Sequence, residues 1–375
     1  MIESPSPSKV LKQDKKEQML QKVRSQIVAK TQPDSRETGQ LLDKIIGMEP
    51  GKLQLLNCSG LDYLVGSLAS TGSQASELGK AIKIINEALS NRKTTFDTID
   101  KDLKYVNSNC TIFLGCTSNM ISSGIRESLA FLMRNRMIDC MVTSCGAIEE
   151  DIIKCMQQYF VGRFDHDGSM LRKNHLARIG NMLVSENGYC SFEDLIIPIL
   201  DVLLVEQINE NRPVIISEFI KKLGEVVDDE SSICYWSFKN DIPIFCPGIV
   251  DGAIGDMVFT HSLRSKAHLY DACPNLENMV QAGNDYVIFD QTHDLIQLSK
   301  MSINAEKKAA VILGGSLPKH HILNASLLGG GADYAVYLTT AVEYDSSDSG
   351  GNVQEAISWG KINSNGKAVK VYGDA

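Results

Sequence analysis

The chain has 375 residues, is 43% hydrophobic and 22% charged, and carries a formal net charge of −9. This composition is typical of a globular protein, and the length suffices for one large domain or two. The negative charge argues against general nucleic-acid binding and suits a cytoplasmic protein with cationic ligands. No apolar run reaches the ~18–20 residues that a membrane span requires. The N-terminus has no apolar core of the kind found in a secretion signal.

The first part of the chain is predicted to be an appendage followed by a helical lead-in. Residues 1–40 combine a Ser-Pro repeat with a highly charged stretch, so we expect a flexible or helical N-terminal arm. Residues 41–109 form the predicted lead-in, where two helical stripes between 61 and 89 are interrupted by a Ser-Thr-Gly-Ser run at 70–73. The main domain is expected to begin at residue 110.

The next segment alternates apolar strands with small-residue turns and helices. Residues 110–114 and 138–143 are typical of buried strands, with a helix over about 120–136 between them and a second helix opening on the acids at 149–151. This order is the pattern of a parallel α/β sheet, in which ligands bind at the carboxyl ends of strands. The chain has no GxGxxG sequence, so the pattern alone does not indicate a dinucleotide.

The middle of the chain is predicted to be mostly structural. Residues 192–208 indicate a long apolar helix that is broken or bent at Pro198, and residues 215–227 an amphipathic helix. Residues 243–247 are typical of another buried strand, which runs into a glycine-rich loop with acids. Residues 264–286 are predicted to be a surface insertion.

Three further strands are predicted near the end, at residues 308–313, 334–338 and 368–372. The expected fold class is therefore α/β: a parallel, Rossmann-like nucleotide-binding sheet with helices on both faces and a mostly helical N-terminal extension. Residues 110–375 would form the catalytic domain.

Residues 343–361, EYDSSDSGGNVQEAISWGK, carry the densest chemistry. The Ser/Asp/Gly run favours turns and offers carboxylates and hydroxyls, and Trp359 lies two residues before Lys361. Carboxylates beside an aromatic face suit an organic cation, and a lysine whose pKa is lowered by burial or neighbouring cations could be a nucleophile. Taken alone, such a run is more often a solvated loop.

Cysteines and histidines do not indicate a metal or a disulfide framework. The ten cysteines occur singly, with no CxxC pair, so we expect mostly reduced core residues. The adjacent His320 and His321 have no partner at metal-ligand spacing. We therefore predict no metal site.

Several motifs from residue 110 onward resemble the deoxyhypusine synthase family in the same order. They are CTIFLGCTSNMISSGIR at 110–126, VTSCGAIEEDIIKC at 142–155, the DGxxGD loop at 251–256, a variant of GGGxxKHH at 314–321, and EAISWGKI following SSDSG. The resemblance implies an NAD-dependent aminobutyltransferase. It would oxidise spermidine, carry the aminobutyl group on its own lysine as an imine, and pass it to a lysine of the precursor of eukaryotic translation initiation factor 5A, the first step of hypusine formation.

The resemblance also implies a role for individual residues. Lys361 would carry the imine and His320 would be the general base. The implied substrate-binding residues are Glu149, Glu150, Asp256, Gly315, Ser346, Ser347, Asp348, Glu355 and Trp359. The implied NAD-binding residues are Ser118, Asn119, Met120, Ile121, Ser122, Ser144, Cys145, Gly146, Glu150, Asp251, Thr340, Ala341, Asp345, Ser349, Asp374 and Ala375.

Some positions depart from the family pattern and leave alternatives open. Cys145, Ala147, Ser316, Ser346 and Asn352 stand where the family usually has other residues, glycine at Ser316 and Ser346 among them. The alternatives are a homospermidine synthase, which uses the same imine chemistry with putrescine as acceptor, and a catalytically impaired paralogue that activates a partner subunit. The family further implies a tetramer with shared active sites.

Overall fold

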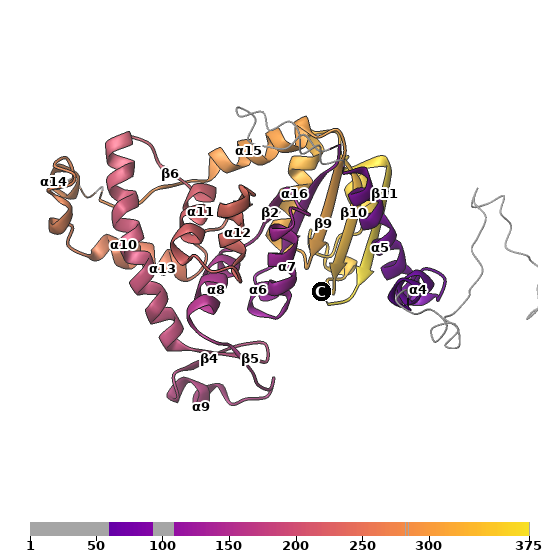
Figure 1. The fold of residues 1–375 in the computed structure, drawn as a ribbon, viewed down its shortest axis with the longest axis horizontal. Coiled ribbons are helices and arrows are strands. Elements are labelled where there is room, and N and C mark those ends of the chain that lie inside the picture. The colour runs from indigo at the N-terminus through magenta and orange to yellow at the C-terminus, as the bar shows by residue number, and fades with distance from the viewer. Residues whose placement is uncertain (1–59, 93–108, 282, 284, 375) are drawn as a thin grey trace, which may run out of the picture.

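The computed structural model describes residues 60–92 and 109–374, apart from 282 and 284 (Figure 1). The predicted arm at 1–40, most of the lead-in before α4, and Ala375 lie outside these residues. The described lead-in consists of α4 (Gly60–Leu68) and α5 (Ser73–Asn91), which matches the two predicted stripes. Among the described residues, no helix is both long and apolar enough to span a membrane.

Six strands form the main sheet in the order β11-β10-β9-β1-β2-β7, and every neighbouring pair is parallel. The predicted parallel α/β sheet is therefore confirmed. The strands are β1 (Thr111–Cys116), β2 (Cys140–Val142), β7 (Ile244–Phe245), β9 (Lys308–Leu313), β10 (Ala332–Thr339) and β11 (Ile362–Tyr372).

The sheet separates two hydrophobic cores because successive side chains of a strand point to opposite faces. In β1, Ile112 and Leu114 belong to one core and Phe113 to the other. In β2, Met141 joins the first core, whereas Cys140 joins the second. Both faces are buried, which explains why these strands have continuous apolar sequences.

Helices cover both faces of the sheet, as predicted (Figure 1). Helix α5 packs against β10 and β11, and the first core also contains side chains of α7 and α8. The second core contains side chains of α15, α16 and α17. The helices that cover the sheet, besides α5, are α6 (Asn119–Ser122), α7 (Ile125–Arg134), α8 (Cys145–Met156), α15 (Gln291–Asn304), α16 (Ser316–Leu328) and α17 (Val353–Ser358).

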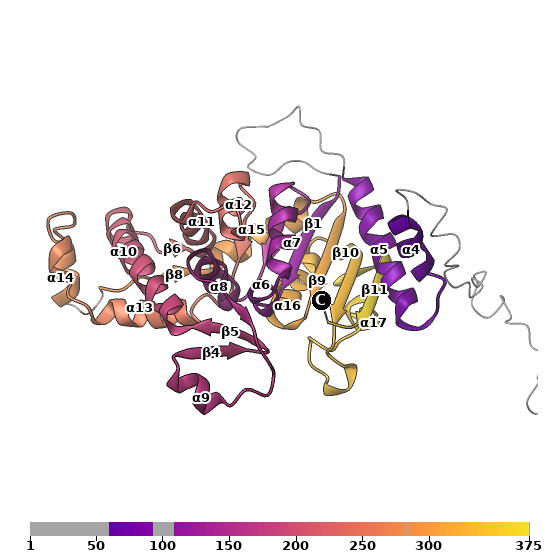
Figure 2. The same ribbon diagram turned by 60° about the horizontal axis from the view of Figure 1, so that its bottom comes forward.

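A small lobe projects from this body between α8 and α10 (Figure 2). Its three antiparallel strands are ordered β3-β5-β4 and are accompanied by α9. The bounds are β3 (Phe160–Val161), α9 (Gly168–Lys173), β4 (Leu176–Ile179) and β5 (Met182–Ser185). We refer to residues 160–185 as the lobe.

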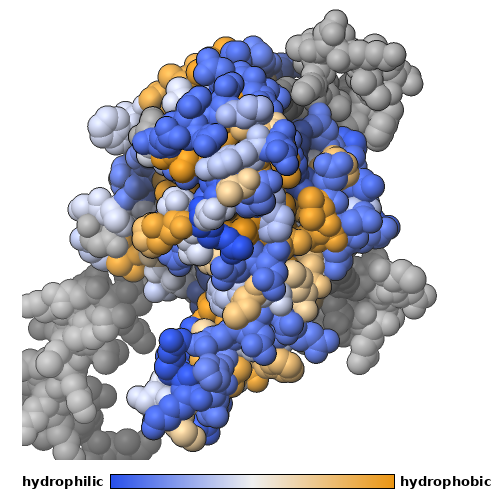
Figure 3. All heavy atoms as spheres, turned by 90° about the vertical axis from the view of Figure 1, so that its left-hand side faces the viewer, coloured by the Kyte–Doolittle hydropathy of each residue, from blue (hydrophilic) through white to orange (hydrophobic). Residues whose placement is uncertain are grey.

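The remaining elements extend the molecule away from α5. Figure 3 views the molecule from this side and shows hydrophobic residues scattered among hydrophilic ones. The elements in this part are α10 (Glu186–Glu210), β6 (Val214–Ile215), α11 (Ile216–Val227), α12 (Ile233–Asn240), α13 (Ala253–Leu263), the 3-10 helix η1 (Ala267–Leu269), α14 (Leu276–Gln281) and β8 (Phe289–Asp290). A second 3-10 helix, η2 (Glu343–Asp345), follows β10.

Several predicted boundaries were wrong. The helix expected over about 120–136 is two helices, α6 and α7, with Ser123 in an extended conformation after α6. Helix α8 begins at Cys145, so the acids at 149–151 lie in its second turn and do not open it. Helix α10 is continuous through Pro198. Strand β11 begins at Ile362, before the predicted 368. Ile362 pairs with Ala332 of β10, and after an irregularity the pairing continues from Lys367.

Candidate active site

The site lies where the strand order reverses, between the carboxyl ends of β1 and β9. From β1 the chain moves toward β2 and β7, and from β9 it moves the other way toward β10 and β11. The loops after β1 and β9 therefore diverge to opposite faces, and the crevice that forms at such a point is the usual ligand position in open α/β sheets.

The loops around this crevice approach so closely that glycine is required. Gly314 has a φ of 91°, and a Cβ atom there would lie 2.6 Å from Thr117 Oγ1. A Cβ on Gly146 would lie 3.0 Å from Ser118 Cβ. Gly315 directly precedes α16 and Ser144 directly precedes α8. Backbone N–H groups at helix N-termini suit a phosphate group, so the glycine-rich starts of α8 and α16 are compatible with a nucleotide.

Glu149 joins the loop after β2 to the loop after β7. Its carboxylate accepts a hydrogen bond from Ile254 N at 3.3 Å and from the Cys145 thiol at 3.5 Å. A Cβ on Gly252 would lie 2.9 Å from Glu149 Oε2, so the loop before α13 closely approaches this carboxylate. Burial raises the pKa of Glu149, and the hydrogen bonds partly offset that rise.

The acidic loop, residues 343–352, is fixed to α16 and β11 by two lysines. The buried Lys319 ammonium donates to the carbonyl oxygens of Asp348 and, at 2.9 Å, Gly351. Lys370 Nζ donates to the carbonyl oxygen of Gly350 at 2.6 Å. Burial lowers the pKa of Lys319, whose Nζ also lies 4.7 Å from the centre of the Tyr337 ring.

Two further contacts complete the attachment of the acidic loop. Ser349 Oγ accepts a hydrogen bond from Ser316 N at 2.6 Å. Asn352 Oδ1 accepts from Glu355 N at 3.1 Å and so caps α17, and Asn352 Nδ2 donates to Glu343 at 2.9 Å. Asn352, one of the departures from the family pattern, is therefore well placed for this geometry.

Asp348 brings the two predicted catalytic residues together. Its Oδ2 lies 2.9 Å from His320 Nδ1, and its Oδ1 lies 3.9 Å from Lys361 Nζ. The Lys361 side chain is 12% exposed and does not extend freely into solvent. His320 is on α16 and Lys361 directly precedes β11, so the fold joins residues 41 positions apart around one carboxylate.

The other predicted site residues differ in accessibility. Six are buried: Met120, Ile121, Ser122, Cys145, Glu149 and Glu150. Exposed side chains belong to Asn119, Asp251, Asp256, Thr340, Ser346, Ser347, Glu355, Trp359 and Asp374. Half-buried positions are Ser118, Ser144, Gly146, Ala341, Asp348 and Ser349, and Gly315 is buried.

Among the described residues, Lys361 forms an ion pair with Asp348 and with none of the other predicted acids. Asp251 and Asp256 form no ion pair with another described residue, and Trp359 is 67% exposed. The side chain of Asp345 and all of Ala375 lie outside what is described. No role was predicted for Lys319 from the sequence. The signal that could have indicated one is its position at the start of a buried helix, directly before His320.

A parallel α/β sheet that places a lysine, a histidine and a carboxylate side by side is the arrangement of an enzyme that can combine acid–base and nucleophilic catalysis. The family model described as "Deoxyhypusine synthase" matches residues 63–375. The chain belongs to the deoxyhypusine synthase family and is accordingly an enzyme of the transferase class.

Individual relatives support this membership. Deoxyhypusine synthase of Kluyveromyces lactis is 43% identical over 354 residues, covering 88% of this chain and 89% of that protein. Homospermidine synthase 1 of Senecio vernalis is 44% identical over 326 residues and covers 84% of each. A crystal structure from Entamoeba histolytica, provisionally named a deoxyhypusine synthase, has 26% identity and a TM-score of 0.54, covering 88% of this chain and 92% of that one.

Proposed function

We propose that this chain transfers the aminobutyl group of spermidine, through an imine on Lys361, to one lysine of the precursor of eukaryotic translation initiation factor 5A, with NAD as cofactor. The observation that carries the proposal is the placement of Asp348 between His320 and Lys361, at 2.9 and 3.9 Å, in a member of this family. We place the reaction in the cytoplasm, as the charge and the protein acceptor suggest.

The NAD site is proposed at the crevice between β1 and β9. The chemistry that bound NAD supplies is removal of a hydride from spermidine and its return to the final imine. The close approach at Gly314 and Gly146 and the helix N-termini after β2 and β9 support a pyrophosphate site there. The residues proposed to line it are those that the family resemblance implied, from Ser118 to Asp374.

The acids around the crevice are proposed to bind the spermidine cation. Asp348 is available beside the lysine, and the exposed Asp256, Glu355 and Trp359 would add carboxylates and an aromatic face. Several spaced carboxylates suit a ligand with several spaced ammonium groups, because a buried charge needs a partner.

His320 is proposed to remove a proton from the substrate amine as the hydride leaves. The contact of Nδ1 with Asp348 leaves Nε2 for the substrate proton and would stabilise the imidazolium that forms. The carbon–nitrogen bond then becomes a double bond, so electrons and protons balance without another reactant.

Lys361 is proposed to attack that double bond as a neutral amine. The new bond joins Lys361 Nζ to the butyl carbon, and 1,3-diaminopropane leaves with the former nitrogen. The Lys361 side chain is only 12% exposed, so it is shielded from water where the attack would occur. The acceptor lysine next displaces Lys361, and hydride return reduces the product imine.

A complete site is proposed to require a second copy of the chain. His320 is 48% exposed and Trp359 67% exposed, although both are assigned to a water-excluding reaction. We therefore propose a tetramer with active sites shared between subunits. We also propose the domain division given by the sequence, in which η1 and α14 belong to the insertion at 264–286.

Homospermidine synthesis remains the second candidate, because a homospermidine synthase is 44% identical to this chain. It uses the same lysine imine and differs in the acceptor, putrescine in place of a protein lysine. A catalytically impaired, activating paralogue is the third. The proximity of His320, Asp348 and Lys361 supports catalysis over that role.

The test is incubation of the purified full chain with NAD and labelled spermidine, with the precursor factor, with putrescine, or with neither. The proposal expects label on the precursor and NADH formation in its absence. His320→Ala is expected to abolish NADH formation while spermidine still binds. Label on putrescine in place of the factor favours homospermidine synthase, and no turnover by the chain alone favours the paralogue.

A further inference from the structure

We propose that Tyr159 and Tyr189 are positioning residues that hold the Glu150 carboxylate in place for cofactor and substrate binding. The inference rests on the proposed function, which assigns Glu150 to the site. Tyr159 Oη donates to Glu150 Oε2, and Tyr189 Oη donates to Glu150 Oε1 at 3.1 Å. Each carboxylate oxygen thus has its own phenol donor.

The phenols replace the solvent that a buried carboxylate lacks. Glu150 is only 4% exposed, and burial raises its pKa, whereas both phenols lower it. The ammonium of Lys154 lowers the pKa of Glu150 without a direct bond to it, because it donates to the carbonyl oxygens of Ile121 at 3.0 Å and Ser123 at 2.9 Å.

The charged and polar groups that face Glu150 come from several elements. They are Lys154 and Glu149 on α8, Ser122 on α6, Tyr159 just after α8, and Tyr189 on α10. Ser122 is in the segment proposed to contact the cofactor, and it lowers the pKa of Glu150, as the two tyrosines do. The carboxylate is therefore influenced both by the cofactor segment and by the two tyrosines.

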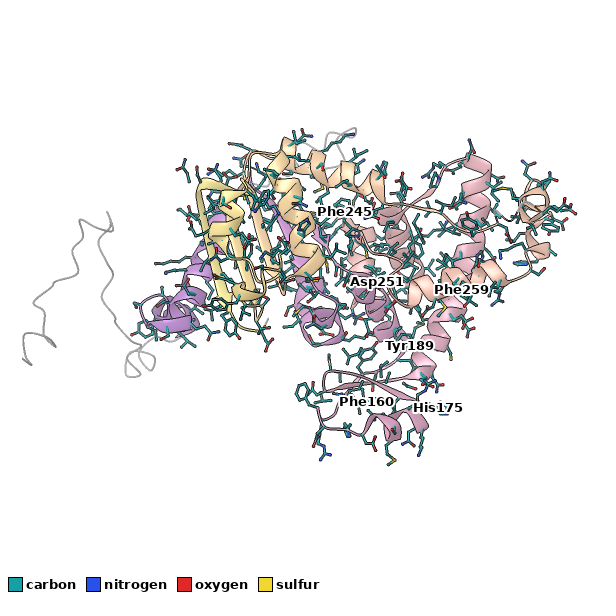
Figure 4. The ribbon with its side chains drawn as sticks, turned by 180° about the vertical axis from the view of Figure 1, so that it is seen from behind. Phe160, His175, Tyr189, Phe245, Asp251 and Phe259 are labelled. Carbon is teal, nitrogen blue, oxygen red and sulfur yellow. The ribbon has the colours of Figure 1, made fainter. Side chains whose placement is uncertain are left out.

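The two tyrosines are at the two ends of the lobe. Tyr159 directly precedes β3, and Tyr189 is in the first turn of α10, directly after β5. Figure 4 shows Tyr189 where α10 meets the lobe that carries Phe160 and His175. The Glu150 carboxylate thus accepts one hydrogen bond from Tyr159, directly before the lobe, and one from Tyr189, just after it.

The consequence is a specific effect on ligand binding. Without its phenols, Glu150 would be ionised over a narrower pH range and would have more than one side-chain orientation. Because Tyr→Phe removes only the hydroxyl, packing of the ring is kept. Tyr159→Phe and Tyr189→Phe should therefore weaken NAD and spermidine binding, most strongly at the acidic end of the pH range.

The experiment compares the full-length chain with Tyr159→Phe, Tyr189→Phe and the double variant. Tyr286→Phe, at a half-exposed tyrosine in the insertion, is the matched control. The KM for NAD and for spermidine and the kcat are measured between pH 6 and 9.5, together with Tm. The proposal expects KM to rise about tenfold in each single variant, with a smaller change in kcat, and the acidic limb of kcat/KM to move to higher pH.

A second background separates positioning from general structure. Glu150→Gln removes the titrating group, so the Tyr→Phe changes should not move the pH profile of that variant further. A lowered Tm with wild-type KM and an unmoved pH profile would show a purely structural role and overturn the inference.

Binding of NAD, followed by calorimetry over the same pH range, distinguishes this failure from failure of the proposed function. If the wild-type chain binds NAD without turnover, an acid-side loss of binding in the Phe variants still supports the positioning role, and unchanged binding refutes it. If the wild-type chain does not bind NAD at all, both proposals fail.

Discussion

Replacing Lys319 by methionine should separate the stability of the fold from the geometry of the site. Lys319 is 2% exposed, and its ammonium donates to the carbonyl oxygens of Asp348 and Gly351 in the acidic loop. Methionine has a similar volume and keeps the contact with the Tyr337 ring, but it cannot donate a hydrogen bond. The acidic loop therefore loses its attachment to α16 at the residue that contacts His320 and Lys361.

The two contributions to stability nearly cancel. A hydrogen bond to a charged group stabilises by about 1.5–3 kcal/mol, and Lys319 donates two. Desolvation of a buried ammonium costs several kcal/mol, and replacement of buried charges by apolar groups of similar volume is often neutral. We expect the free energy of unfolding to change by less than about 1.5 kcal/mol.

Activity should respond far more than stability. A displacement of about 1 Å in a catalytic group can reduce the rate about 10²-fold, and the Asp348 backbone is held directly by this ammonium. We expect kcat/KM for spermidine oxidation to fall by about 10²-fold or more. Urea denaturation and NADH formation measure the two quantities on the same samples.

The control is Lys367→Met, where the lysine is 57% exposed and pairs with Glu87 on the surface. This change should alter stability by less than ~0.5 kcal/mol and leave turnover intact. Wild-type kcat/KM in Lys319→Met, with the fold preserved, would refute the reasoning that the lysine fixes the acidic loop.

Three further predictions concern other parts of the fold. Gly314→Ala should destabilise by about 1–3 kcal/mol and abolish NAD binding, because its Cβ would meet Thr117 at 2.6 Å; calorimetry showing normal binding contradicts this. Ser316 has a φ of 55°, so Ser316→Gly should leave stability unchanged or raise it by up to ~1 kcal/mol in denaturant titrations, and a clear loss would be inconsistent with strain. Burial raises the pKa of Asp294 from 3.8 to about 6, so the stabilisation from its protonated form, about 3 kcal/mol, is present below pH 4 and lost as the pH rises past 6; Asp294→Asn should flatten this dependence, and parallel unfolding curves for both proteins would disprove it.

The sheet was largely predictable from sequence because strands buried on both faces have continuous apolar runs. β9 at Lys308–Leu313 was predicted with its observed bounds for this reason. Boundaries set by tertiary contacts were less predictable. Helix α8 begins at Cys145, and the local sequence does not distinguish that start from one at the acidic residues 149–151. Similarly, β11 begins at Ile362 because that residue pairs with Ala332 of β10, although the four residues after it are polar or glycine.

The site was predicted unevenly. His320 and Lys361 were found through a family resemblance carried by adjacent motif residues, and the structure brings both to Asp348. Lys319 was overlooked because lysine is most often exposed, and its two carbonyl acceptors are about 30 residues away in sequence. The pairing of Tyr189 with Glu150 spans 39 residues and follows no periodic pattern, so only a three-dimensional structure reveals it.

Two of the serines with positive φ illustrate what a resemblance can indicate before a structure is available. Ser316 and Ser346 stand where the family usually has glycine, and both adopt the left-handed conformation, with φ values of 55° and 57°. The departures therefore lie at positions where glycine is physically favoured. The backbone keeps its course there with a serine in place.

Trapping of the imine on Lys361 is the most direct test of the reaction proposed here. The full chain is incubated with NAD and labelled spermidine, reduced with cyanoborohydride, digested and analysed by mass spectrometry. The account predicts an aminobutyl adduct on Lys361 in the wild-type chain and none in Lys361→Arg, which keeps the charge beside Asp348 but cannot form the imine. An adduct on another lysine, or turnover to deoxyhypusine by Lys361→Arg, would contradict it.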